Sequence, residues 1–141
     1  EQTHTEAVKG LLDQYGLPDP ADSSPEGVFA NPDLQQLYDS LIERGTATLS
    51  EALKVGGAIE EIDILDLQTA LEETDSPDIR RVYENLLKGS ENHLRAFTTT
   101  LSRQTGEVYT PQYLSQAAYD DILSMNTTGG GGYGRGSGRR P

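Results

Sequence analysis

The only two histidines in the chain each lie on the apolar side of a segment with helical periodicity. His93 shares its side of a long helical segment with apolar neighbours three or four residues away, and His4 does the same in Glu1-x-x-His4. Glu60 and Asp63 stand among the apolar residues of a third helical segment. Four-helix bundles build dinuclear metal sites from inward Glu-x-x-His and Glu side chains on separate helices. The sequence therefore predicts a metal site, while these residues do not reveal whether a reaction occurs there.

Nitrogen and oxygen donors of this kind suit iron, manganese or zinc. Two other interpretations stay open. A single histidine on an apolar face is often a core residue that is hydrogen-bonded to a neighbour. Glu60 and Asp63 could instead form a buried ion pair with Arg95 or Lys88. Glu1 is the weakest candidate ligand, because a chain terminus frays and its own amino group could compete for the carboxylate.

Two adjacent acids on the third segment are expected to point in different directions. At ~100° per residue, Glu60 lies about 100° from Ile59, next to small and apolar residues, and is predicted to face inward. Glu61 and Gln68 fall on the other side and are predicted to face water. The tyrosines, Tyr109 among them, are expected to pack through their rings and leave their hydroxyls in water.

Helix start and stop signals divide the chain. Asn31-Pro32 and Ser76-Pro77 are typical caps followed by proline at the first helical position, and Thr48-x-x-Glu51 has capping-box spacing. Gly89 lies inside a predicted helix, where it costs ~1 kcal/mol relative to alanine, and this indicates a close approach by another helix. The predicted helices cover residues 1–15, Pro32 to Gly45, Thr48 to about Glu73, Pro77 to about Gln104, and a short turn after Ser115. No stretch alternates well enough to predict a strand.

The two longest helices are joined by a short turn and must therefore pack antiparallel. The first helix reaches them through a long connection that holds a short extra helix. The expected fold is all-α: a four-helix bundle with a long crossover that lacks its N-terminal helix, in residues 1–125, followed by a flexible Gly/Arg-rich tail, 126–141. The apolar stripes on residues 1–15 and 77–104 then have no fourth wall, and exposed apolar area is unfavourable. We expect the missing N-terminal helix or a neighbouring copy to cover them, and a copy would build an oligomer or filament.

Composition limits the function further. The 141 residues make one domain, contain no cysteine and include no apolar run long enough for a membrane span. Of the net charge of −12, the tail carries three arginines and no acid, so the rest of the chain carries −15. Such a body should repel nucleic acid, and nucleic-acid binding is expected only through the tail. Because the chain begins at Glu1 without Met, we expect a processed chain or a fragment.

Four segments carry a resemblance to a known family: EQTHTEAVKGLLDQYGLPDP, VGGAIEEIDILDLQ, VYENLLKGSENHLRAF and QTGEVYTPQYLSQAAYDDIL. Through them, residues 1 to about 124 resemble the uncharacterised ferritin-like family called domain of unknown function 2202. The resemblance implies a ferritin-like bundle, a location outside the cell or in the cell envelope, and no established activity.

The resemblance also implies a set of metal ligands: Glu1 and His4 from one helix, Glu60 from the second and His93 from the third. The chain departs from the family pattern because it lacks the usual first helix with its glutamates. In addition, Ser90 occupies the place where a second Glu-x-x-His would put its carboxylate. Asp63 could compensate, so that a mononuclear or structural site is as consistent with the pattern as a di-metal site.

Overall fold

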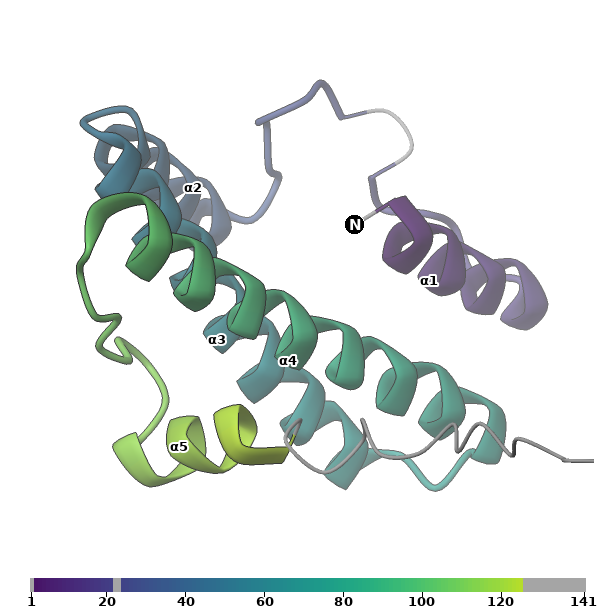
Figure 1. Ribbon diagram of the computed structural model, residues 1–141. Helices are drawn as coiled ribbons and strands as arrows, with labels where there is room; N and C mark the ends of the chain where they lie inside the picture. The colour runs from purple at the N-terminus through teal and green to yellow at the C-terminus, as the bar shows by residue number, and fades with distance from the viewer. Residues whose placement is uncertain (1, 22–23, 126–141) are drawn as a thin grey trace, which may run out of the picture.

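The computed structural model describes residues 2–21 and 24–125 of the chain. Glu1, residues 22–23 and the predicted tail 126–141 lie outside the described residues. The described residues form helices and no strand, which confirms the predicted all-α class (Figure 1). The helices are α1 (Gln2–Tyr15), α2 (Pro32–Gly45), α3 (Leu49–Glu73), α4 (Pro77–Thr105) and α5 (Gln116–Ser124).

The helix ends follow the predicted signals with one exception. The side chain of Asn31 caps α2, that of Thr48 accepts a hydrogen bond of 3.1 Å from the third residue of α3, and that of Ser115 caps α5. Ser76 occupies the predicted cap position of α4, but within the described residues its side chain makes no capping hydrogen bond. Its Oγ lies instead 3.2 Å from the hydroxyl of Tyr15, so this serine connects α4 to α1.

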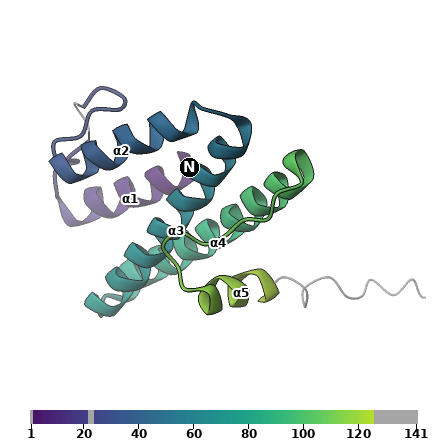
Figure 2. The ribbon, with the colours of Figure 1, turned by 90° about the vertical axis from the view of Figure 1, so that its left-hand side faces the viewer.

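An antiparallel hairpin of α3 and α4 forms the centre of the protein, as the short turn between them predicted (Figure 1). α2 packs on α3, and α1 packs on α4. The chain after α4 crosses to the other face of the hairpin, where α5 lies away from α1 and α2 (Figure 2). Ile64, Leu94 and Leu101 are fully buried between these layers, together with Tyr109 and Tyr119 from the last segment. The core therefore depends on the C-terminal segment as well as on the hairpin.

Two adjacent glycines in α3 allow close packing on two sides. A Cβ on Gly56 would lie 2.6 Å from Cδ1 of Phe97 on α4, and a Cβ on Gly57 would lie 2.6 Å from Cε2 of Tyr109. Real Cβ atoms do not approach other atoms this closely, so both positions need a residue without a side chain.

A groove remains open between α3 and α4. It has a volume of about 430 Å³, and no described segment fills it. Its walls are mainly apolar, with one acid and one imidazole at one end: Leu53, Glu60, His93, Ala96, Phe97 and Thr100. None of the described helices is both long enough and apolar enough to cross a lipid bilayer.

Candidate metal site

The carboxylate of Glu60 on α3 faces the imidazole of His93 on α4. Glu60 is buried, and its Oε1 lies 3.4 Å from Nδ1 of His93. This separation exceeds the usual ~2.9 Å of an N–H···O hydrogen bond. Two donor atoms that each lie ~2.1 Å from one tetrahedral metal ion are themselves ~3.4 Å apart. The separation of 3.4 Å therefore fits a long ion pair and also fits two ligands of one metal ion.

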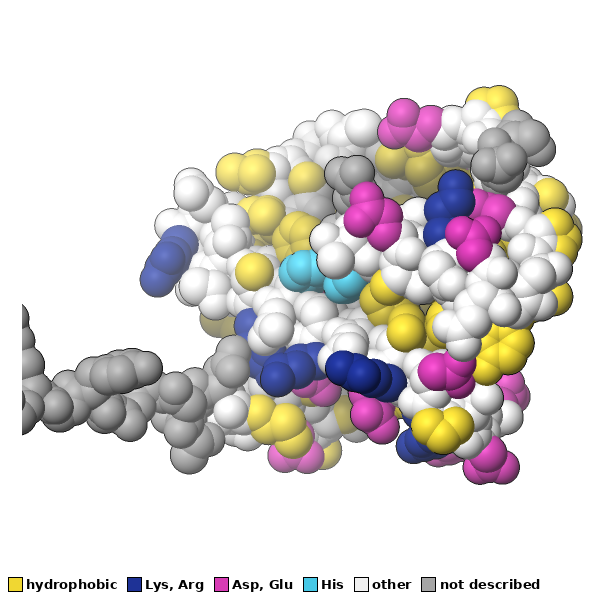
Figure 3. Space-filling model, turned by 90° about the vertical axis from the view of Figure 1, so that its right-hand side faces the viewer, with side chains coloured by type: hydrophobic (Ala, Val, Ile, Leu, Met, Phe, Trp, Pro, Cys, Tyr) yellow, Lys and Arg dark blue, Asp and Glu magenta, His cyan; other side chains and the backbone are white. Residues whose placement is uncertain are grey.

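The imidazole of His4 lies against that of His93, with ring centroids 5.4 Å apart and planes inclined by 32°. Figure 3 shows the two histidine side chains together on one face of the protein, next to apolar side chains. The edge of the His4 ring that carries Nε2 and Cε1 rests over Gly89, where an added Cβ would lie 2.7 Å from Cε1. The close approach predicted at Gly89 is thus confirmed, and a side chain from α1 makes it.

Contacts at both ends of α1 fix how it lies on α4. At one end, the hydroxyl of Tyr15 donates to the carboxylate of Asp78 at 3.0 Å, while at the other His4 meets Gly89. Eleven residues separate His4 from Tyr15 and also Asp78 from Gly89, a rise of ~16 Å on each helix. The two helices therefore run antiparallel in matched register, which brings His4 to His93.

Of the remaining predicted ligands, Asp63 is among the described residues and Glu1 is not. Asp63 is half-buried on α3, one turn beyond Glu60. Within residues 2–21 and 24–125, no group of three or more His, Asp or Glu side chains is already arranged to hold a metal ion. The described donors come as two pairs that share His93: Glu60 with His93, and His4 with His93.

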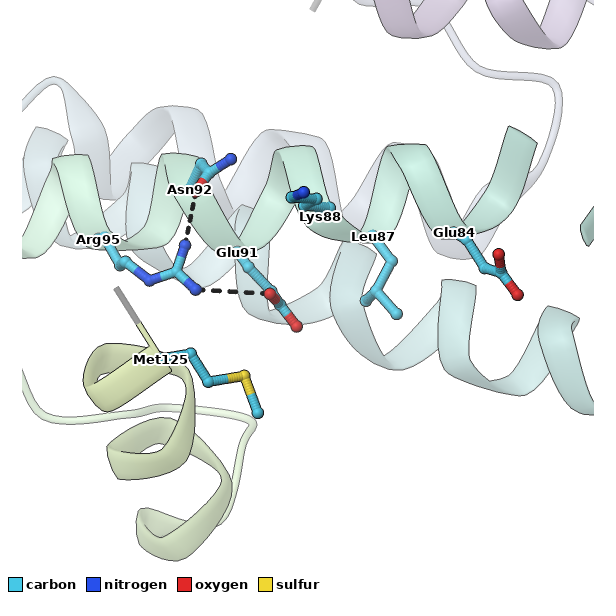
Figure 4. Close-up of a pocket in the computed structure, with 7 residues that line it drawn as sticks. All are labelled: Glu84, Leu87, Lys88, Glu91, Asn92, Arg95 and Met125. Carbon is cyan, nitrogen blue, oxygen red and sulfur yellow. Dashed lines mark hydrogen bonds and ion pairs between the residues drawn. The ribbon is translucent and has the colours of Figure 1, made fainter. Parts of the chain in front are cut away.

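Within residues 2–21 and 24–125, the ion pair that the structure shows for Glu60 is with His93 and not with Arg95 or Lys88. Arg95 donates through Nε to the carbonyl of Ile122 at 2.8 Å and lies 3.5 Å from Glu91 on its own helix. Lys88 and Arg95 line a separate hollow of about 450 Å³ on the side of α4 near the end of α5 (Figure 4). Arg95 thus holds α5 in place, and the neighbour of Glu60 in the groove is the imidazole of His93.

Glu61 was predicted to face water, and this prediction is wrong. The side chain is fully buried and accepts a hydrogen bond of 2.7 Å from the hydroxyl of Tyr109. It also accepts from the backbone N–H groups of Gln112, Tyr113 and Leu114 at 2.9, 2.6 and 2.8 Å. The hydroxyl of Tyr109 is consequently inside the protein, where burial and the bond to Glu61 raise its pKa. These donors occupy the carboxylate in a structural role.

Comparison with known proteins gives relatives without an assigned function. The sequence matches, over residues 1–126, the family described as "Uncharacterized protein domain (DUF2202)". It is 49% identical over 130 residues to the uncharacterized protein MJ0754 of Methanocaldococcus jannaschii, covering 92% of this chain and 70% of that protein. The fold is similar to the crystal structure of hypothetical protein MJ0754 from Methanococcus jannaschii, with a TM-score of 0.84 and 49% identity over 89% of this chain and 71% of that chain.

Proposed function

We propose that this chain, which belongs to the DUF2202 family, is a metal-binding helical protein that holds iron, manganese or zinc between α3 and α4. Glu60 and His93 are the central ligands, and His4 is the third. The observation that carries the proposal is the 3.4 Å between Glu60 Oε1 and His93 Nδ1, which equals the separation of two ligands on one tetrahedral ion. Glu1 and Asp63 remain candidates for a further coordination position.

The residues around the pair favour a single ion. A dinuclear site in a helical bundle takes a second Glu-x-x-His motif, whose glutamate would precede His93 by three residues. That position is Ser90, which is buried and brings no carboxylate. One metal ion held by two imidazoles and one carboxylate matches the donor set of many mononuclear sites. We therefore propose a mononuclear site rather than a dinuclear one.

Metal analysis of the purified full chain tests this proposal. The protein is stripped with a chelator, reloaded separately with zinc, manganese or anaerobic ferrous iron, and desalted before elemental analysis. We expect about one equivalent of bound metal per chain and, for Glu60→Gln and His93→Ala, at least about ten-fold weaker binding. Glu72→Gln, an exposed carboxylate on the same helix, serves as the matched control and should bind like the wild type. Absence of stoichiometric metal in the wild type would refute the proposal, as would wild-type binding by both variants.

The open groove supports a second candidate function, that of a structural subunit in an oligomer or filament outside the cell. Leu53 and Phe97 line the groove, and Ile59 beside Glu60 is 40% exposed. A helix from a neighbouring copy would cover this apolar surface, and a head-to-tail contact of that kind produces rings or filaments. The extracellular or cell-envelope location is part of this candidate and comes from the family resemblance.

Light scattering and electron microscopy of the full chain separate this candidate from a monomeric metal protein. A discrete oligomer or filament that dissociates when Phe97 is replaced by Asp would support the structural role. A folded monomer at micromolar concentration would contradict it and would leave the metal proposal intact.

A further inference from the structure

We infer that the metal ion, by taking His4 as well as His93 as a ligand, fastens α1 to α4 and thereby sets the fraction of molecules in which α1 is docked. The inference rests on the proposed metal site and gives that site a regulatory consequence. Under it, α1 is an arm that closes when metal is bound and opens when metal is removed.

The first step is that α1 buries little of its surface against the rest of the protein. Among the described helices it contacts α4 alone. None of the side chains of residues 3–15 is buried, and Val8 and Tyr15 on its apolar stripe are 39% and 47% exposed. Apolar stabilisation scales with the area removed from water, so this helix gains little from its contact. Segments with few buried contacts open locally while the rest of the protein stays folded.

The second step is that polar contacts at the two ends hold α1 in register. At the far end, Gln14 and Tyr15 both donate to Asp78, in an exposed setting where hydrogen bonds contribute little. At the near end, the contact is the His4 imidazole over Gly89 and beside His93. One end of the arm is therefore formed by the residues that are proposed to bind the metal.

The third step is that the distance between the imidazoles fits a shared ion. Two imidazoles bound to one tetrahedral metal ion have ring centroids ~5 Å apart, because each centroid lies ~3.2 Å from the ion. The rings of His4 and His93 are 5.4 Å apart with α1 docked. The docked position of α1 therefore already brings the two rings to about the spacing of a shared ion. With α1 undocked, His4 leaves the neighbourhood of His93, so that the metal favours the docked state.

The size of the effect follows from linkage. Because Glu60 and His93 can still bind metal when α1 is open, metal lowers the population of the open state by at most the ratio of the two dissociation constants, which is about ten-fold for one lost imidazole ligand. By reciprocity, weakening the docking of α1 weakens metal binding, up to the same ratio. A change in metal concentration therefore changes the fraction of molecules in which the apolar stripe on α1 and the surface it covers on α4 are exposed to water.

Hydrogen exchange of the full chain with and without saturating zinc tests the inference. We expect zinc to slow amide exchange in α1 of the wild type by up to about ten-fold. The variant His4→Ala should still bind zinc through Glu60 and His93, more weakly, and should show no zinc-dependent protection of α1. Asp78→Asn is the matched control: it removes the other end contact, so α1 exchanges faster without metal but gains the same fold of protection from zinc.

The possible results separate this inference from the proposed function. Zinc that binds the wild type without changing exchange in α1 overturns the inference and leaves the metal site standing. Zinc-dependent protection that survives in His4→Ala also overturns it. A wild-type chain that binds no zinc, manganese or iron removes the metal site and the inference together.

Discussion

The hydroxyl of Tyr109 donates a hydrogen bond of 2.7 Å to Oε1 of Glu61 in the interior of the protein. The other carboxylate oxygen accepts from the backbone of Tyr113 and Leu114, so one acid on α3 anchors the segment that leads from α4 to α5. Burial of a carboxyl group is costly unless hydrogen-bond donors surround it, and here they do. The neighbouring acid, Glu60, points about 100° away around the helix and meets His93. Adjacent acids thus serve two separate parts of the molecule.

Replacing Glu61 should destabilise the protein strongly. In Glu61→Gln the new amide N–H₂ faces hydrogen-bond donors, so one of the two acceptor oxygens of this network is lost. We expect the free energy of unfolding to fall by about 2–4 kcal/mol, the range for breaking a buried hydrogen-bond network. Urea unfolding at neutral pH measures this, and Glu72→Gln on the exposed face of α3 should stay within ~0.5 kcal/mol of the wild type. Equal urea midpoints for the two variants would show that the Glu61 contacts contribute nothing.

Stability should also decline at alkaline pH. Burial first, and the hydrogen bond to Glu61 second, raise the pKa of Tyr109 above its ordinary value of 10.0. The neutral hydroxyl is therefore favoured in the folded state, and its stabilisation is fully present below the unfolded pKa and lost as pH rises beyond it. Urea midpoints measured from about pH 8 to pH 11 should drop most steeply above about pH 10. Tyr109→Phe should reduce this drop, and part of it should remain because burial also raises the pKa of Tyr119. An unchanged slope in the variant would contradict the assignment.

Helical periodicity and capping signals predicted the helices almost to the residue, because local residue types decide where a helix starts and stops. Helical periodicity also predicted that His4, Glu60 and His93 lie on the sides of their helices that face a shared interior. The structure shows His93 next to both other residues. Whether these residues bind a metal stays a prediction.

The burial of Glu61 was not predicted, because a helical wheel gives the direction of a side chain and not what covers it. Its partner is an extended segment some fifty residues later, whose path across α3 has no local sequence signal. Gly57 was a usable clue, because it lies four residues before Glu61 on the same side of α3 and leaves room for the ring of Tyr109. The capping prediction for Ser76 was wrong for a similar reason. Tyr15 of another helix lies beside its side chain, and a local sequence signal does not reveal such a neighbour.

Two glycine-to-alanine changes in helices should have opposite effects. In Gly56→Ala the new Cβ collides with the ring of Phe97, so we expect a net loss of about 1–3 kcal/mol despite the better helix propensity of alanine. In Gly10→Ala on α1 the Cβ meets nothing within 4 Å. That variant should show no loss of stability. The helical state of α1 should be favoured by the ~1 kcal/mol difference in propensity between alanine and glycine. Thermal unfolding followed by circular dichroism compares them, and a stabilised Gly56→Ala would mean that Phe97 does not pack there.

A substitution at Gly89 should separate stability from metal binding. In Gly89→Ala the Cβ would lie 2.7 Å from Cε1 of His4, which is the far end of a flexible side chain. The imidazole can swing away while the backbone of α4 stays in place, and alanine improves the helix by ~1 kcal/mol. We therefore expect unchanged or higher thermal stability.

Displacement of the His4 imidazole should nevertheless move it away from His93. The contact of His93 with Glu60 on α3 does not involve α1 and should stay in place. Zinc titration by calorimetry should then show about ten-fold weaker binding, and zinc should no longer slow amide exchange in α1. Gly10→Ala, with open space around its Cβ, should titrate like the wild type. If Gly89→Ala keeps both wild-type zinc affinity and zinc-dependent protection of α1, His4 is not a ligand. The glycine would then serve packing alone.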